Sequence, residues 1–116
     1  KVLIVEDEPH VAEALVFLCE REGLQADVVT DGAAALGRLA DCQLVILDIM
    51  LPGASGFDIA AAVRRLPAPP KVCVLTAKGQ PGDRARMNEI GVNAFVTKPF
   101  SNKELMDTVR SLMAAP

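Results

Sequence analysis

The sequence predicts an α/β fold in which one parallel sheet is covered by helices on both faces. Five short apolar stretches recur along the chain, and segments with helical periodicity separate them. The middle three stretches are rich in β-branched residues without clean alternation, which is typical of strands buried on both faces. Alternating strands and helices imply right-handed crossovers, so the strands should run parallel. With 116 residues, the chain is expected to form one three-layer domain over residues 1–116.

The first half of the chain alternates as this fold requires. The stretch "KVLIV" (1–5) is the first predicted strand, and an amphipathic helix that ends near Gly23 follows it. Its expected buried face is made of Val11, Ala14, Leu15, Leu18 and Cys19. Then come a strand "ADVVT" (26–30), a helix "GAAALGRLA" (32–40) and a strand "QLVILD" (43–48).

The second half continues the alternation. The helix "GFDIAAAVRRL" (56–66) is stopped by "PAPP", and the strand "KVCVLT" (71–76) follows. A fourth helix is expected within 82–90, after the loop "KGQPG", with an apolar stripe of Ala85, Met87 and Ile90. After the strand "NAFVT" (93–97), Ser101 and Glu104 have the spacing of a capping box. The apolar face of the last helix is expected to contain Leu105, Val109 and Leu112.

Composition narrows the function. The net charge of -3, with both signs interspersed, gives no basic patch for nucleic acid or an anionic membrane. No apolar run approaches the roughly 20 residues of a membrane span, and nothing resembles a signal peptide. We therefore expect a cytoplasmic protein. Cys19, Cys42 and Cys73 lie in or beside apolar segments and are interpreted as reduced core residues.

Polar side chains follow four of the five predicted strands. Glu6, Asp7 and Glu8 follow the first, Asp48 ends the third, Thr76 ends the fourth and Lys98-Pro99 follows the fifth. Ligands of open α/β sheets bind beyond the carboxyl ends of the strands. These groups are therefore expected to share one crevice.

Three carboxylates in that crevice, from Glu6, Asp7 and Asp48, would repel one another, so they need a cation or partial protonation. Mg²⁺ prefers oxygen ligands and typically binds through one or two carboxylates together with a phosphate oxygen. Thr76 offers a hydroxyl donor and Lys98 a positive charge for further phosphoryl oxygens. The pattern predicts a magnesium and phosphoryl site in which Asp48 attacks phosphorus.

These residues resemble those of the receiver domain of two-component response regulators, over about residues 1–113. The likeness is a constellation of four motifs in order: "VEDE", "DIMLPGASG", "LTA" and "TKPF". It implies a flavodoxin-like (βα)₅ fold with strand order 2-1-3-4-5. It also implies phosphoryl transfer onto Asp48 from a sensor histidine kinase or a histidine phosphotransfer protein, in a regulatory domain that is not an enzyme.

The resemblance also implies roles for single residues. Asp7, Asp48 and the backbone carbonyl of Met50 would bind Mg²⁺, and Glu6 would act largely through water, at a position where the family often has Asp.

Thr76 would bond the phosphoryl group and Lys98 would pair with it, aimed by a cis Lys98-Pro99 peptide. Phe95 occupies the switch position, although a permanently buried strand residue is the competing interpretation.

The family also suggests partners and a lifetime. Phosphorylation would change the face formed by the fourth helix, fifth strand and fifth helix, which a downstream protein or a fused output domain would read, from a monomer or a phosphorylation-dependent dimer. Met50 and Lys78 flank the path of the hydrolytic water in the family, and a bulky Met50 should slow hydrolysis. Asn93 and Ala94 replace an acidic pair that supports the standard dimer.

Three other functions compete with this one. An Mg-dependent aspartate-nucleophile phosphatase would carry its nucleophile in a DxD after the first strand, where this chain has "ED". A flavin-binding module would want aromatic side chains, but the chain has no Trp, no Tyr and only four Phe. A pseudo-receiver would lack site residues that are present here. His10, just after Pro9, is interpreted as a solvated residue at a helix start.

Overall fold

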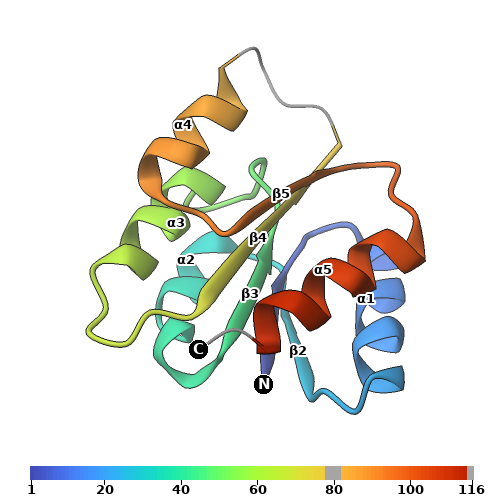
Figure 1. The fold of residues 1–116 in the computed structure, drawn as a ribbon. Coiled ribbons are helices and arrows are strands. Elements are labelled where there is room, and N and C mark those ends of the chain that lie inside the picture. Colours follow the sequence, from blue (N-terminus) through green and yellow to red (C-terminus); the bar gives the residue numbers. More distant parts are fainter. Residues whose placement is uncertain (78–81, 115–116) are drawn as a thin grey trace.

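The computed structural model describes residues 1–77 and 82–114, and Figure 1 shows its fold. Strands and helices alternate along the chain as the sequence predicts. The strands are β1 (Val2–Val5), β2 (Ala26–Val29), β3 (Leu44–Leu47), β4 (Lys71–Thr76) and β5 (Ala94–Thr97). The helices are α1 (Pro9–Arg21), α2 (Gly32–Leu36), α3 (Gly56–Arg64), α4 (Asp83–Ile90) and α5 (Asn102–Ala114), with a 3₁₀ turn at Leu39–Asp41.

The five strands form one parallel sheet in the order β2-β1-β3-β4-β5, which confirms the predicted fold and strand order. Val5 is paired with both Val29 and Leu47, so β1, β2 and β3 end level with one another. The loops that follow these strands consequently open at a common edge. The predicted site residues belong to that edge.

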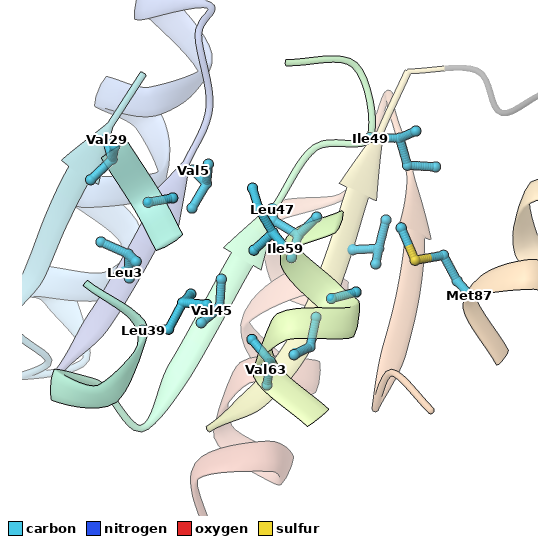
Figure 2. Packing of buried hydrophobic residues seen from close by; sticks show 14 residues of the cluster. Leu3, Val5, Val29, Leu39, Val45, Leu47, Ile49, Ile59, Val63 and Met87 are labelled. Atoms are coloured by element: carbon cyan, nitrogen blue, oxygen red, sulfur yellow. The ribbon is translucent and has the colours of Figure 1, made fainter. Parts of the chain in front are cut away.

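Helices cover both faces of the sheet and divide the core in two. In Figure 1, α1 and α5 lie on one side of the sheet, and α2, α3 and α4 lie on the other. One apolar cluster includes Leu47, Ile59 and Met87 and is drawn in Figure 2, and the second includes Ile4, Leu15 and Leu105. Alternate residues of each strand supply the two clusters, as expected of strands covered twice.

The predicted apolar faces are mostly confirmed, with corrections at two helices. In α1 the buried residues are Ala12, Leu15, Leu18 and Cys19. Ala14 is exposed, so its placement on the buried face was wrong; alanine carries too little apolar surface to distinguish the two positions. In α5 Leu105 and Val109 are buried, while Leu112 is half-buried. In α4 only Met87 is buried, whereas Ala85 is exposed.

The second predicted helix is shorter than expected. Helix α2 ends at Leu36 with Gly37 as its C-cap, and a 3₁₀ turn follows it instead of a continuous helix through residue 40. Gly37 gives the helix little reason to continue, because glycine is among the poorest residues in a helix interior. The capping residue predicted for the last helix is found at the start of α5. Ser101 Oγ accepts the Glu104 backbone N–H at 3.3 Å, one of the two hydrogen bonds of the predicted capping box.

Two glycines hold the loop after β3 in place by close backbone approach. A Cβ atom at Gly32 would lie 1.9 Å from the Ala54 carbonyl oxygen, and one at Gly56 would lie 2.4 Å from the Asp48 carbonyl oxygen. In the space that these missing side chains leave, the Gly32 N–H donates to Pro52 O at 2.9 Å and the Gly56 N–H donates to Ile49 O at 3.0 Å. The helices α2 and α3 therefore hold both ends of this loop by main-chain contacts.

In the described ranges, no helix combines the length and the apolar character needed to cross a lipid bilayer.

The three cysteines are free thiols, and burial dominates their chemistry. Burial raises the pKa of Cys19 to about 11, with help from Glu20 and Glu22, and raises that of Cys73 to about 12. Cys42 is half-buried, and burial raises its pKa as well. The prediction that Cys19 and Cys73 are core residues is confirmed.

We expect these thiols to resist alkylation in the folded protein. At pH 8, iodoacetamide should modify Cys42 first and leave Cys19 and Cys73 largely unreacted, because thiolate is the nucleophile. All three should react in denaturant. Since Cys19 and Cys73 hold their protons more tightly when folded, their contribution to stability should be constant below about pH 9 and fall as the pH rises toward 11 and 12. Mass spectrometry of the alkylated peptides checks the order of alkylation, and equal rates for the three thiols would contradict it. Urea titrations at increasing pH check the loss of stability.

Candidate functional site

The candidate site lies where the carboxyl ends of the central strands meet. Glu6 follows β1, Asp48 follows β3, Thr76 ends β4 and Lys98 follows β5. Backbone hydrogen bonds fix the strand ends to one another: the Asp48 N–H donates to Val5 O at 3.1 Å, and the Lys98 N–H donates to Thr76 O at 2.7 Å. Residues far apart in the sequence are thus brought to one edge by strand pairing.

Lys98 links the acidic residues of the site. Its Nζ lies 2.7 Å from Glu6 Oε1 and 3.3 Å from Asp48 Oδ2, and the Lys98-Pro99 peptide is cis, as the resemblance implied. Only 15% of the Lys98 side chain is exposed. Burial by itself would lower the pKa of Lys98, but the hydrogen bond to Glu6 and the charges of Asp48 and Glu6 outweigh burial and raise it. Lys98 is therefore firmly protonated.

Glu6 is almost fully buried, with 2% of its surface exposed. Its Oε1 accepts from Lys98, and its Oε2 accepts the Glu8 backbone N–H at 3.1 Å. Both carboxylate oxygens therefore have a partner, which offsets much of the cost of burying a charge. The Glu6 carboxylate is a fixed negative charge in the site, and it holds the Lys98 ammonium beside Asp48.

Asp48 is 8% exposed, and each of its carboxylate oxygens has a hydrogen-bond partner. Oδ1 accepts the Met50 backbone N–H at 3.3 Å, while Oδ2 faces Lys98. These contacts give the carboxylate partners at the end of an apolar, buried strand. The carboxylate is positioned by its own loop and by the lysine from β5, at a depth that shields it from most of the solvent.

Glu6, Asp7 and Asp48 form the acidic cluster that the sequence predicted. Carboxylate oxygens from all three lie within 4.8 Å of one another. Three carboxylates against one ammonium leave this cluster negatively charged, and its donors are hard oxygens, which suit Mg²⁺ or Ca²⁺ far better than Zn²⁺. Asp7 is the exposed member of the three, so the cluster can be reached from solvent at this residue. The residues present therefore fit a hard divalent cation.

Thr76 and Phe95, the two residues of the predicted switch, lie on neighbouring strands of the sheet. Thr76 is 2% exposed at the last position of β4, the strand between β3 and β5. Phe95 pairs with Val74 across the sheet and is half-buried against the cluster that contains Met87. Part of the side chain therefore lies against the core and part is accessible. Thr76 pairs with Thr97 at the end of β5, so Phe95 lies two positions closer to the start of that strand.

Three residues noted in the sequence lie at the margin of the site or outside it. The Met50 side chain is 74% exposed beside Asp48. His10 is exposed at the start of α1, as expected. Lys78 falls outside the described residues.

Sequence reasoning missed two features around the site. Glu8 was grouped with the acidic residues of the crevice, but its carboxylate is the N-cap of α1 and accepts from the His10 and Val11 N–H groups. An acidic residue directly before Pro9 at a helix start is the signal that could have revealed this role. The second is Arg84, which lies over the Phe95 ring at 5.2 Å and which no local pattern indicates.

Removing one charge from the acidic cluster should stabilise the metal-free protein. We expect Asp7→Asn to raise the free energy of unfolding by about 1 kcal/mol in the presence of EDTA, because repulsion at this spacing in a partly solvated site is of that order. Adding MgCl₂ should narrow or reverse the difference, since bound cation stabilises only the intact cluster. Urea titrations measure both values. The control Glu13→Gln, at an exposed position of α1, should change little, and an Asp7→Asn variant less stable than wild type in EDTA would contradict the expectation.

Comparison with known proteins places this geometry in a family. The family model described as "Response regulator receiver domain" matches residues 2–110. Among solved structures, a putative response regulator from Chloroflexus aurantiacus J-10-fl superposes with a TM-score of 0.90 at 30% identity, covering 98% of this chain and 97% of the other.

Curated relatives agree with the family model. The chain is 43% identical over 114 residues to the sensory transduction protein RegX3 of Mycobacterium tuberculosis (strain H37Rv), covering 97% of this chain and 50% of the relative. It is 42% identical to the transcriptional regulatory protein CutR of Streptomyces coelicolor, covering 97% of this chain and 52% of the relative. The chain thus spans about half the length of these curated relatives. These matches do not favour the aspartate-nucleophile phosphatase considered above.

Proposed function

The chain belongs to the receiver domains of two-component response regulators, and from this premise we propose that it is a signalling switch whose phosphoacceptor is Asp48. The donor would be a sensor histidine kinase or a histidine phosphotransfer protein. The observation that carries the proposal is the position of Lys98 Nζ, within hydrogen-bonding distance of both Glu6 and Asp48 at the edge that also holds Asp7. This arrangement combines a nucleophilic carboxylate, a fixed positive charge and a set of hard oxygen donors.

The proposed chemistry is a single phosphoryl transfer. A carboxylate oxygen of Asp48 attacks phosphorus, a new O–P bond forms, and the bond from phosphorus to the donor imidazole nitrogen breaks, with its electron pair leaving on that nitrogen. The product is an aspartyl phosphate. Lys98 needs little movement to pair with the phosphoryl oxygens, since its ammonium already faces Asp48 Oδ2.

Mg²⁺ is the expected cofactor, held by Asp7, Asp48 and the Met50 backbone carbonyl, with Glu6 acting largely through water. When bound, the ion would neutralise charge on the transferring phosphoryl group. Support comes from the donor chemistry of the cluster, in which carboxylate oxygens from three residues lie within 4.8 Å of one another. Glu6 also keeps Lys98 in place through its 2.7 Å contact, so its role need not include direct ligation.

The output is proposed to pass through Thr76 and Phe95 to the surface formed by α4, β5 and α5. A phosphoryl group on Asp48 would attract the Thr76 hydroxyl and change the position favoured by Phe95. A shift from almost wholly inactive to almost wholly active would need about 5 kcal/mol of differential interaction. Such a domain is regulatory, although loss of its own phosphoryl group by hydrolysis is part of the proposal.

The readers of this signal are proposed from the relatives. Two of them are named as a sensory transduction protein and a transcriptional regulatory protein, so a downstream protein or a fused output domain is the expected partner, with no nucleic-acid contact by this domain itself. Asn93 and Ala94 argue against the standard acidic dimer contact, which leaves a monomer or another phosphorylation-dependent dimer. Three free thiols suit a reducing cytoplasm.

Direct phosphorylation tests the proposal. The purified domain would be incubated with acetyl phosphate and MgCl₂ and examined by intact-mass spectrometry. We expect the mass of one phosphate to be added, EDTA to prevent the gain, and borohydride reduction followed by peptide mapping to place the phosphate on Asp48. A protein that stays unmodified under these conditions, or carries phosphate on another residue, would refute the proposed function.

Met50 should prolong the life of the aspartyl phosphate. Its side chain is 74% exposed, and its backbone N–H is bonded to the Asp48 carboxylate, so a bulky apolar group stands beside the nucleophile. We expect the phosphate to last minutes or longer and Met50→Asn to shorten its half-life by about tenfold, as expected when a polar group can orient water. Met113→Asn, at a half-buried position of α5, is the control. Loss of the phosphate from the wild-type protein within seconds, measured by intact mass after removal of acetyl phosphate, would contradict this expectation.

A further inference from the structure

Arg84 of α4 contacts Phe95 of β5 in two ways. Its guanidinium carbon lies 5.2 Å from the centroid of the Phe95 ring. Its NH2 group also donates a hydrogen bond to the Phe95 backbone oxygen at 3.3 Å. The strand β5 is at the edge of the sheet, so this carbonyl receives a donor from a helix side chain. One side chain thus restrains both the ring and the backbone of the proposed switch residue.

Both residues of the contact line a groove on the surface formed by α4, β5 and α5. Arg84 and Phe95 line this groove of about 350 Å³ together with Thr97, Phe100 and Glu104. Phe95 is half-buried there and also packs against the apolar cluster that contains Met87. The ring therefore lies between the core and the Arg84 guanidinium, and any change in its position must alter the contact with Arg84.

Helix α4 contributes two apolar side chains to the core cluster, Met87 and the partly buried Ile90. Met87 is its one buried residue, and its N-cap, Gly82, offers no side-chain hydrogen bond. Arg86 stacks on Phe57 of α3 at 3.9 Å, so α4 is joined to α3 on one side by one arginine and to β5 by another. A helix with few buried side chains can shift at low cost, so the contacts of these two arginines contribute to fixing its position.

We propose that Arg84 is a positioning residue that holds Phe95, and with it α4, in the unphosphorylated arrangement. The inference rests on the proposed function of Asp48 and deepens it, because it names the contact that sets the resting state of the switch. A residue that favours the resting arrangement opposes the phosphorylated one by the same free energy. Weakening the Arg84 contact should therefore move the unphosphorylated protein toward the phosphorylated arrangement.

Fluorine NMR of the full chain tests this inference. The four phenylalanines would be replaced by a fluorinated analogue, and the Phe95 signal assigned with Phe95→Leu. The spectra of wild type, Arg84→Ala, Arg84→Lys and Arg86→Ala would be recorded before and after treatment with acetyl phosphate and MgCl₂. Intact mass measured on the same samples reports phosphorylation of Asp48 separately from the position of Phe95.

In unphosphorylated Arg84→Ala, we expect the Phe95 signal to move toward its phosphorylated position, with about a threefold to tenfold larger share of that state. Arg84→Lys should give an intermediate share, because lysine keeps the charge and loses the planar donors. Arg86→Ala is the matched control: it removes an arginine from the same helix and should move the signal of Phe57 but not that of Phe95.

Two results would overturn the inference while leaving the proposed function intact. One is a Phe95 signal in phosphorylatable Arg84→Ala that coincides with wild type before treatment. The other is an equal displacement of that signal in Arg86→Ala, which would indicate a general loosening of α4. If acetyl phosphate adds no phosphate to wild type, the proposed function fails, and the role assigned to Arg84 fails with it.

Discussion

Asp48→Asn is expected to reduce phosphorylation by acetyl phosphate below detection. The substitution keeps the size and shape of the side chain but replaces the anionic oxygens with a neutral amide, which is a far weaker nucleophile toward phosphorus. The variant should remain folded, because the amide oxygen can still accept the Met50 N–H bond that Asp48 accepts at 3.3 Å. Intact-mass spectrometry and circular dichroism measure the two properties.

The matched control is Asp41→Asn. Asp41 is an exposed aspartate in the 3₁₀ turn that precedes β3, so it lies before the strand that Asp48 follows. This variant should gain one phosphate at the rate of wild type. Phosphate on Asp48→Asn at the level of wild type would show that another residue is the acceptor, and the assignment of Asp48 would then be wrong.

Gly56→Ala should destabilise the fold by about 3 kcal/mol, at the upper end of the usual cost of overpacking. The added Cβ would lie 2.4 Å from the Asp48 carbonyl oxygen and 2.7 Å from Ile49 Cα. Both atoms belong to the backbone, which cannot rotate away as a side chain can. The start of α3 must therefore move away from the loop that carries Asp48, and phosphorylation should slow as well.

Gly37→Ala is the control for this substitution. Gly37 caps α2 with a φ of -80°, which alanine adopts without strain, and the nearest atom to an added Cβ is 3.8 Å away. We expect no loss of stability, or a gain of about 0.5 kcal/mol from reduced freedom of the unfolded chain. Urea titrations of the two variants measure the contrast, and equal stability of Gly56→Ala and Gly37→Ala would show that the close approach is not rigid.

Most of the fold could be predicted because local and long-range signals agree. The apolar strands, the turn residues and the helical periodicity of α1 and α5 indicate the same layered sheet. The sequence alone places the acidic cluster and Lys98 at one edge, since parallel strands deliver their carboxyl ends to the same side. The cation that the carboxylates require is supplied in part by Lys98, whose Nζ contacts both Glu6 and Asp48.

The remaining features depend on tertiary placement. No spacing rule could choose between Ala12 and Ala14 as the buried alanine of α1, because both lie near the edge of the apolar stripe. The break at Gly37 required weighing one glycine against a run of good helix formers. Arg84 contacts Phe95 between the largely exposed helix α4 and the edge strand β5. No local pattern in the sequence predicts this contact, because α4 has one buried residue and therefore no clear apolar periodicity.

The glycine contacts beside the β3 loop bear on how such a domain can diversify. Because the N–H groups of Gly32 and Gly56 bond to Pro52 O and Ile49 O, main-chain atoms fix the loop that carries Asp48, the proposed phosphoacceptor. Outward-facing side chains of α2 and α3 are then free to drift over generations without disturbing it. New docking preferences could be acquired on those surfaces while the chemistry underneath is left unchanged.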